Sequence, residues 1–306
     1  MGCCNAEKLA TLPAILAAVA ITAAAWQPTG VQLINTGHFQ EALAAFEATL
    51  RTDTKSVAAN NGAAVALDLM GRYREAQPYF AAAIKASHTP LERALAERAM
   101  AIGYGFAADC PNAEKLEKRA FEFYVDTLDF PNAGDVADEL GRLCLDAGDV
   151  DRASGWYQRG HDEGLQEPKI SPARTDLWDF RLAHAKGRMA AQRGKIEEAR
   201  RQAQKARAIL DRGRISDQEE FFPYLQGYIN FYAKDYAGAL SALNRASPSD
   251  PFIQCLIART YEALDDRGHA VEFYQRTAAA TAHSVPAAYA QPFARRKLAA
   301  WNLIRP

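Results

Sequence analysis

The side chains closest to a metal-binding cluster are His161, Asp162 and Glu163, which follow one another in a predicted helix. Adjacent residues of an α-helix point to different faces, so these three cannot converge on one ion. We therefore interpret them as part of a solvent-exposed surface. The sequence also lacks a Gly-rich phosphate loop, a His-Glu-x-x-His motif and a Gly-x-Ser-x-Gly motif. It predicts no catalytic residue, no metal and no cofactor, and we expect a non-enzymatic protein.

A six-residue signature recurs six times along the chain and ends in alanine each time. The copies span residues 37–42, 71–76, 148–153, 194–199, 234–239 and 265–270. Four begin with glycine, which accepts the left-handed conformation found just past a helix C-terminus. Each copy therefore predicts a turn between two helices. Units of this kind bury their apolar faces only against their neighbours, which favours a stacked array of helices.

A small residue also stands seven positions before each turn. These residues are Gly30, Ala64, Gly141, Gly187, Gly227 and Ala258. Glycine inside a helix costs about 1 kcal/mol relative to alanine. Four glycines at one position of the repeat therefore indicate close packing between helices.

The second helix of each unit completes the pattern. Alanine is followed four residues later by an aromatic residue in Ala42/Phe46, Ala76/Phe80, Ala153/Tyr157 and Ala270/Tyr274. With the Leu140-Gly141 pair, this pattern resembles tetratricopeptide repeats over residues 27–282. The resemblance implies an all-α, right-handed α-solenoid of about seven helical hairpins. We expect a degenerate unit at about 89–130 and a C-terminal capping helix at about 286–302, with Arg295-Arg296-Lys297 on its polar outer face.

The resemblance also implies a concave groove lined by the first helix of each unit. In unit six the groove positions would be occupied by Phe221, Tyr224, Tyr228, Phe231 and Tyr232, and in unit five by Arg181, His184 and Arg188. Aromatic side chains are favoured anchors for bound peptides, and arginines suit carboxylates. The alternatives are that the rings pack in the core and that the basic residues form an ordinary charged helix face.

The first 25 residues differ from the rest. Residues 9–26 carry no charge, and Ala23-Ala24-Ala25 has the small-x-small form of a signal-peptidase site. We interpret residues 1–25 as a cleaved leader, with a membrane anchor or an apolar packing helix as alternatives, and residues 26–306 as the solenoid. A leader predicts export to the periplasm or outside the cell, and its absence a cytoplasmic protein. An anchor would associate the protein with a membrane.

Cysteine usage and net charge limit the remaining options. Cys144 and Cys255 lie among apolar neighbours and read as small buried residues, whereas Cys110 precedes a proline in a turn and is expected to be exposed. These three do not form a disulfide framework, although one pair plus a free thiol stays open for an exported protein. The formal net charge of −1 gives no general attraction for nucleic acid.

Together these features predict an interaction scaffold or adaptor that binds a segment of a partner protein in the concave groove. The alternative is an extracytoplasmic sensor whose solenoid recognises a peptide or a small molecule. Both hypotheses rest on the fold, which does not by itself determine function.

Overall fold

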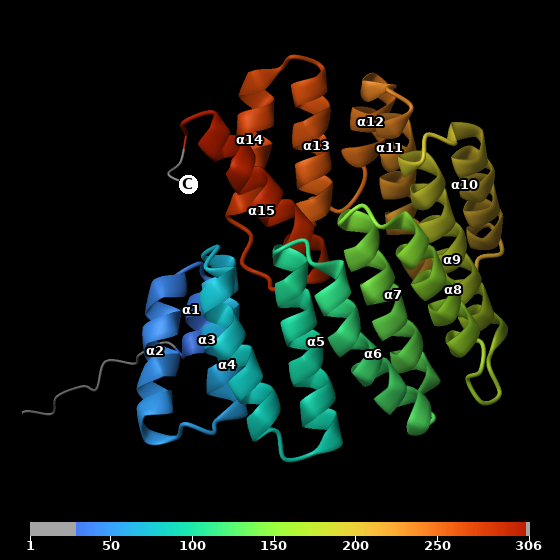
Figure 1. Ribbon diagram of the computed structural model, residues 1–306. Helices are drawn as coiled ribbons and strands as arrows, with labels where there is room; N and C mark the ends of the chain where they lie inside the picture. Colours follow the sequence, from blue (N-terminus) through green and yellow to red (C-terminus); the bar gives the residue numbers. More distant parts are fainter. Residues whose placement is uncertain (1–28, 304–306) are drawn as a thin grey trace, which may run out of the picture.

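A computed structural model describes residues 29–303, which form fifteen α-helices and one 3₁₀ helix (Figure 1). The first four hairpins are α1 (Gly30–Asn35) with α2 (Phe39–Thr52), α3 (Val57–Leu69) with α4 (Tyr73–Ala86), α5 (Pro90–Phe106) with α6 (Cys110–Asp126), and α7 (Phe130–Asp146) with α8 (Val150–Gly164). The next three are α9 (Pro172–Gln192) with α10 (Ile196–Leu210), α11 (Phe222–Tyr232) with α12 (Tyr236–Leu243), and α13 (Pro251–Ala263) with α14 (Arg267–Ala278). The 3₁₀ helix η1 (Ser216–Phe221) precedes α11, and α15 (Val285–Ala300) ends the array. The predicted all-α solenoid of seven hairpins is confirmed.

The turn inside each hairpin has the conformation that the signature predicts. The first residue of every copy has a positive φ, between 72° and 93° at the four glycines and 63° and 60° at Lys234 and Asp265. Ala108 adopts the same conformation, with a φ of 55°, between α5 and α6. Residues 108–113 are thus a seventh copy of the turn, and the unit interpreted as degenerate is a regular hairpin.

The alanine that ends each copy is inaccessible to solvent in all seven hairpins. These residues are Ala42, Ala76, Ala113, Ala153, Ala199, Ala239 and Ala270, each 0% exposed. Close packing between the two helices of a hairpin also explains the small residues of the first helices. A Cβ atom added to Gly227 would lie 2.5 Å from Cγ of Leu243, and one added to Gly141 would lie 3.0 Å from the Tyr157 ring. The predicted close contact between paired helices is confirmed.

Helix α15 packs on α13 and α14 and also contacts α5 and α7 (red in Figure 1). Its first half, through Ala287 and Ala288, belongs to the hydrophobic core shared with the first units. Ala294 and Leu298 belong to the core of the later units. The last helix therefore joins the two cores across the inner side of the solenoid, which the sequence did not predict.

The polar face expected on α15 is only partly exposed. Arg296 is exposed, but Arg295 is partly buried and donates a hydrogen bond to the carbonyl oxygen of Leu69, at the end of α3. Lys297 forms an ion pair with Glu262 at 2.6 Å. The assignment of all three basic residues to an outer face was therefore wrong, because α15 lies between other helices.

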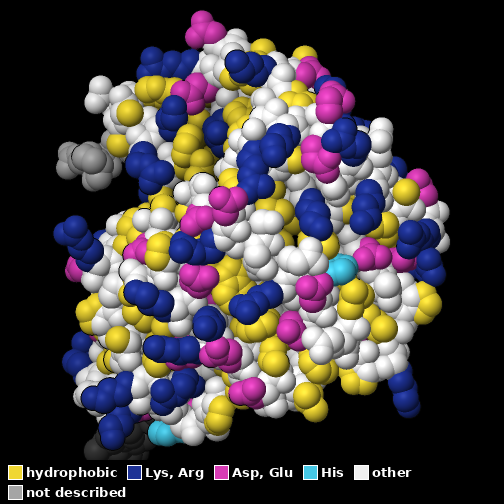
Figure 2. Space-filling view, turned by 45° about the vertical axis from the view of Figure 1, so that its right-hand side comes forward, with side chains coloured by type: hydrophobic (Ala, Val, Ile, Leu, Met, Phe, Trp, Pro, Cys, Tyr) yellow, Lys and Arg dark blue, Asp and Glu magenta, His cyan; other side chains and the backbone are white. Residues whose placement is uncertain are grey.

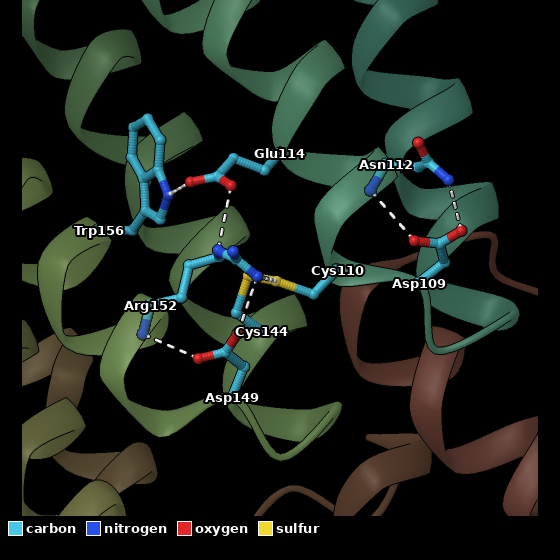
Figure 3. Close-up of a disulfide and its surroundings, with 8 residues drawn as sticks. All are labelled: Asp109, Cys110, Asn112, Glu114, Cys144, Asp149, Arg152 and Trp156. Atoms are coloured by element: carbon cyan, nitrogen blue, oxygen red, sulfur yellow. Dashed lines mark hydrogen bonds and ion pairs between the residues drawn. A yellow bond between two sulfur atoms is a disulfide. The ribbon is translucent and has the colours of Figure 1, made fainter.

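Cys110 and Cys144 form a disulfide between α6 and α7, with an S–S distance of 2.07 Å (Figure 3). The expectation that Cys110 is exposed was wrong, since it is buried at the start of α6, and Cys144 is buried but not free. Arg152 lies beside the disulfide, with Nη1 3.9 Å from the sulfur of Cys110, and forms an ion pair with Glu114. Cys255 is a buried free thiol, as predicted for a small core residue.

The segment interpreted as a leader or anchor lies outside the described residues. Within residues 29–303, no helix combines the length and the apolar character needed to cross a membrane. On the face drawn in Figure 2, side chains of both signs are interspersed without a continuous basic patch.

Candidate functional site

The inner side of the solenoid holds a pocket of about 830 Å³. Its wall is built from the first helices of five consecutive units, α5, α7, α9, α11 and α13, together with Tyr157 of α8 and part of η1. Residues 283–286, from the loop before α15 and its first turn, line another side. The last helix thus converts part of an open groove into a pocket.

Five of the eight residues expected in the groove line this pocket. They are Arg181, His184, Arg188, Phe221 and Tyr224. Arg188 and Tyr224 are 5% and 4% exposed, whereas Phe221 is 41% exposed and provides an accessible apolar surface. The basic residues of unit five and part of the aromatic set of unit six therefore belong to one site.

The other three aromatic residues lie away from the pocket. Tyr228 is 2% exposed in the core, where its ring stacks on Phe252 with 6.3 Å between centroids. Phe231 and Tyr232 pack against the same core cluster, and the guanidinium of Arg259 lies 4.7 Å from the centre of the Phe231 ring. The groove interpretation does not hold for these residues, because that part of α11 packs between neighbouring helices.

Most arginines of the pocket have a carboxylate partner. Arg98 forms an ion pair with Glu139 at 2.8 Å, and Arg181 forms one with Asp135 at 2.5 Å. The Nε atom of Arg142 lies 2.9 Å from Asp146. These pairs connect different units, except for the last, which lies within α7.

Arg188 is the one pocket arginine that has no carboxylate partner among the described residues. No carboxylate lies within ion-pair distance of its guanidinium, and its Nη2 donates a hydrogen bond of 2.8 Å to the hydroxyl of Tyr157. Its Nε and Nη1 atoms are buried without a hydrogen-bond partner among the described residues. The same holds for Nη2 of Arg142 and for the hydroxyl of Tyr224. Buried donors without partners are rare in folded proteins, and each calls for an explanation.

Burial and neighbouring charges also change the ionisation of pocket residues. Burial, and then the Arg188 charge, lowers the pKa of His184 well below its ordinary value, so this imidazole is neutral near pH 7. Burial raises the pKa of Asp138 to about 7, against the opposing effect of Arg181. Burial likewise raises the pKa of Tyr157 to about 12, so its hydroxyl keeps its proton. The pocket therefore has neutral donors beside fixed positive charges.

The sequence analysis did not predict two groups of pocket residues. Arg98 and Ile102 of α5 occupy the same positions relative to Ala108 as His184 and Arg188 do relative to Gly194. The alanine at position 113 was the available signal, but Cys110-Pro111, which begins α6, was interpreted as part of a turn. Nothing in the sequence indicated that His283 and the start of α15 reach the pocket.

The cluster of His161, Asp162 and Glu163 forms no convergent site. His161 is mostly buried, contrary to the expected exposed surface, and its Nε2 lies 2.9 Å from Asp179 of α9. Across residues 29–303, no group of histidine, cysteine, aspartate and glutamate side chains is placed to hold a metal ion.

No protein-family model matches the sequence, and no curated protein sequence matches it. Solved structures do resemble it. A tetratricopeptide repeat protein from Parabacteroides merdae matches with a TM-score of 0.50 and 12% identity, over 86% of this chain and 96% of that chain. A structure of the APC/C hetero-tetramer Cut9-Hcn1 gives 0.45 and 14%, over 87% and 48% of the two chains, and yeast Tom70 gives 0.31 and 10%, over 81% and 67%. The first of these likenesses shows that the chain has the tetratricopeptide repeat fold.

Proposed function

We propose that the protein is a non-enzymatic interaction scaffold that binds a segment of a partner protein in the inner pocket. The observation that carries this proposal is the construction of the pocket wall from five consecutive first helices. Such a wall offers a continuous inner surface, and the solenoid's curvature makes it concave. The solved structures of this fold include chains crystallised with a partner, such as Cut9-Hcn1, which is in keeping with this use.

The composition of the pocket supports a protein segment as its occupant. Phe221 offers an exposed aromatic surface, while ion pairs such as Arg98–Glu139 and Arg181–Asp135 place both signs of charge along the wall. An apolar contact flanked by charged and polar groups is the usual arrangement of a protein interface. The balanced charge argues against nucleic acid as the partner.

The second candidate is a sensor that binds a peptide or a small molecule, and one observation favours it. The start of α15 lines one side of the pocket, and the pocket volume of about 830 Å³ is typical of small-molecule sites, which span about 300–1,000 Å³. In this case the pocket would bind the peptide or small molecule that is sensed, and a partner protein would contact another surface.

We further propose that the protein is exported. The Cys110–Cys144 disulfide supports this location, because disulfides persist mainly in oxidising compartments. The apolar segment before residue 26 has the sequence form of a leader. If this segment is not cleaved and acts as an anchor, it would hold the solenoid at a membrane. Recovery of the mature N-terminus from the source cell, with the fraction in which it is found, tests this proposal.

Site-specific photo-crosslinking distinguishes the two functions. The photoreactive residue p-benzoyl-phenylalanine is placed at Phe221 in the pocket, and in a control protein at Leu264, which is 46% exposed and outside the pocket. After illumination in source-cell extract, a peptide adduct found only at position 221 supports the scaffold. A small-molecule adduct there supports the sensor, whereas the same adducts at both positions would contradict both.

A further inference from the structure

We infer that Arg142, Arg188 and Tyr224 form a binding site for one carboxylate group of the pocket's occupant. The inference rests on the proposed function, since it assigns chemistry to the same pocket. Four buried donor atoms of these residues have no partner among the described residues: Nη2 of Arg142, Nε and Nη1 of Arg188, and the hydroxyl of Tyr224. All three side chains line the pocket. A ligand that accepts hydrogen bonds would satisfy them.

The local charge indicates an anion. Arg188 is 5% exposed and has no ion-pair partner in residues 29–303, while Arg142 is paired with Asp146. Asp138 and Asp250 also line the pocket and act on these arginines through space, but neither lies within ion-pair distance of Arg188. A buried charge is costly unless it is paired and hydrogen bonded. A bound carboxylate would give Arg188 the direct partner that it lacks among the described residues.

The two guanidinium groups lie against the same aromatic ring. The central carbon of Arg142 is 5.6 Å from the centre of the Tyr224 ring, and that of Arg188 is 5.9 Å from it. Both positive charges therefore lie beside the Tyr224 ring, whose hydroxyl is a further donor. The three residues come from α7, α9 and α11, so three consecutive units build the site.

A carboxylate fits this arrangement better than a phosphate. A carboxylate carries one charge and has lone pairs for about four hydrogen bonds, which matches the four unpartnered donor atoms. A phosphate would bring up to two charges. Asp135, Asp138 and Glu139 line the same pocket and would oppose the second charge.

Nuclear magnetic resonance of the full-length protein tests the site without a known partner. The probes are acetate, neutral acetamide and inorganic phosphate, and the reporter is the Nε–H signal of Arg188, identified by its loss in Arg188→Met. We expect acetate to shift this signal saturably, phosphate to bind at least threefold more weakly, and acetamide to have no effect. N-acetyl-trialanine with a free or an amidated C-terminus then shows whether a peptide carboxylate or only a small free acid is accepted.

Stability measurements separate a binding role from a structural one. Acetate should raise the melting temperature of wild type and of Arg200→Gln, which loses an exposed arginine of α10 outside the pocket, but not that of Arg188→Met. Without acetate, Arg188→Met should melt no lower than wild type, because it removes an unpaired buried charge. Tyr224→Phe, which loses only the hydroxyl, should keep its melting temperature and weaken acetate binding severalfold.

Two results would overturn the inference. One is the absence of a saturable acetate shift in wild type, which would mean that water alone satisfies the donors. The other is a large loss of stability in Arg188→Met together with unchanged acetate binding in Tyr224→Phe. Acetate binding without any crosslink at Phe221 would leave the carboxylate site standing and contradict the scaffold, so the two failures are distinguishable.

Discussion

His283 and Asp68 form a buried hydrogen-bonded pair, with 3.0 Å between Nε2 and Oδ2, although 215 residues separate them in the sequence. Their side chains are 7% and 0% exposed, and the His283 ring also stacks on Phe106 with 5.1 Å between centroids. This pair joins the loop before α15 to α3. Because residues 283–286 line the pocket, the contact that closes the solenoid also shapes the binding site.

Replacing His283 should destabilise the protein and release α15. His283→Ala leaves the Asp68 carboxyl buried without its partner and removes the stacking on Phe106. Breaking a buried pair in this way costs roughly 3 kcal/mol. Chemical denaturation measures the loss of stability, and hydrogen exchange should show faster exchange in α15 than in α9.

His269→Ala is the matched control, because His269 also pairs with an aspartate but is 56% exposed. An exposed pair contributes about 0–1 kcal/mol, so this variant should stay close to wild type. Equal stability of the two variants would show that the contact between α15 and α3 is unimportant.

Two glycine substitutions test the packing that defines the repeat. Gly227→Ala would place a Cβ 2.5 Å from the buried side chain of Leu243 and should destabilise the protein by about 1–3 kcal/mol. Gly155→Ala on α8 meets no atom within 4 Å and should stabilise it by up to about 1 kcal/mol. Opposite signs in urea unfolding are expected, and a stabilising Gly227→Ala would refute the close contact.

The disulfide should contribute measurably to stability. Reduction frees a loop closed over 34 residues, for which chain entropy predicts a loss of about 3–4 kcal/mol. Thermal unfolding with and without dithiothreitol measures it. The double variant Cys110→Ala/Cys144→Ala should melt lower than oxidised wild type and should not respond to the reductant. If dithiothreitol does not change the wild-type melting temperature, the result would argue that the bond does not form.

Asp138 should make stability depend on pH. Its pKa is raised to about 7 by burial, whereas an unfolded aspartate titrates near pH ~4. The folded state therefore binds the proton more tightly, and the contribution of Asp138 is fully present below pH ~4 and is lost as the pH rises through about 7.

Asp138→Asn removes this titration while Arg181, Asp135 and His161 stay in place around it. The stability of the variant relative to wild type should increase between pH ~4 and ~7. Denaturation at a series of pH values measures this difference. A difference that is constant over this range would contradict the raised pKa.

The sequence predicts the hairpins well because their signals are local. A glycine at the turn and a buried alanine five residues later act within one unit, so Gly148 and Ala153 already locate α7 and α8. The position within the repeat then places Arg188 and Tyr224 on the inner wall. At Ala108, as at Lys234 and Asp265, the same turn with a positive φ forms without glycine.

Features that depend on distant contacts could not be predicted in this way. Tyr224 and Tyr228 are the same residue type one helical turn apart and both pack against Phe252, yet only Tyr224 lines the pocket. The pairing of Cys110 with Cys144 and the return of α15 to α3 likewise arise between units. Periodicity within a unit carries no information about such contacts.

The most direct test of the central claim measures the affinity of the occupant identified by crosslinking at Phe221. Titration calorimetry compares wild type with Arg188→Met and with Arg200→Gln, which loses the same charge from an exposed residue of α10. We expect Arg188→Met to weaken binding at least tenfold, or about 1.4 kcal/mol, and Arg200→Gln to change it less than about twofold. Equal dissociation constants for all three proteins would contradict a pocket that holds its occupant through Arg188.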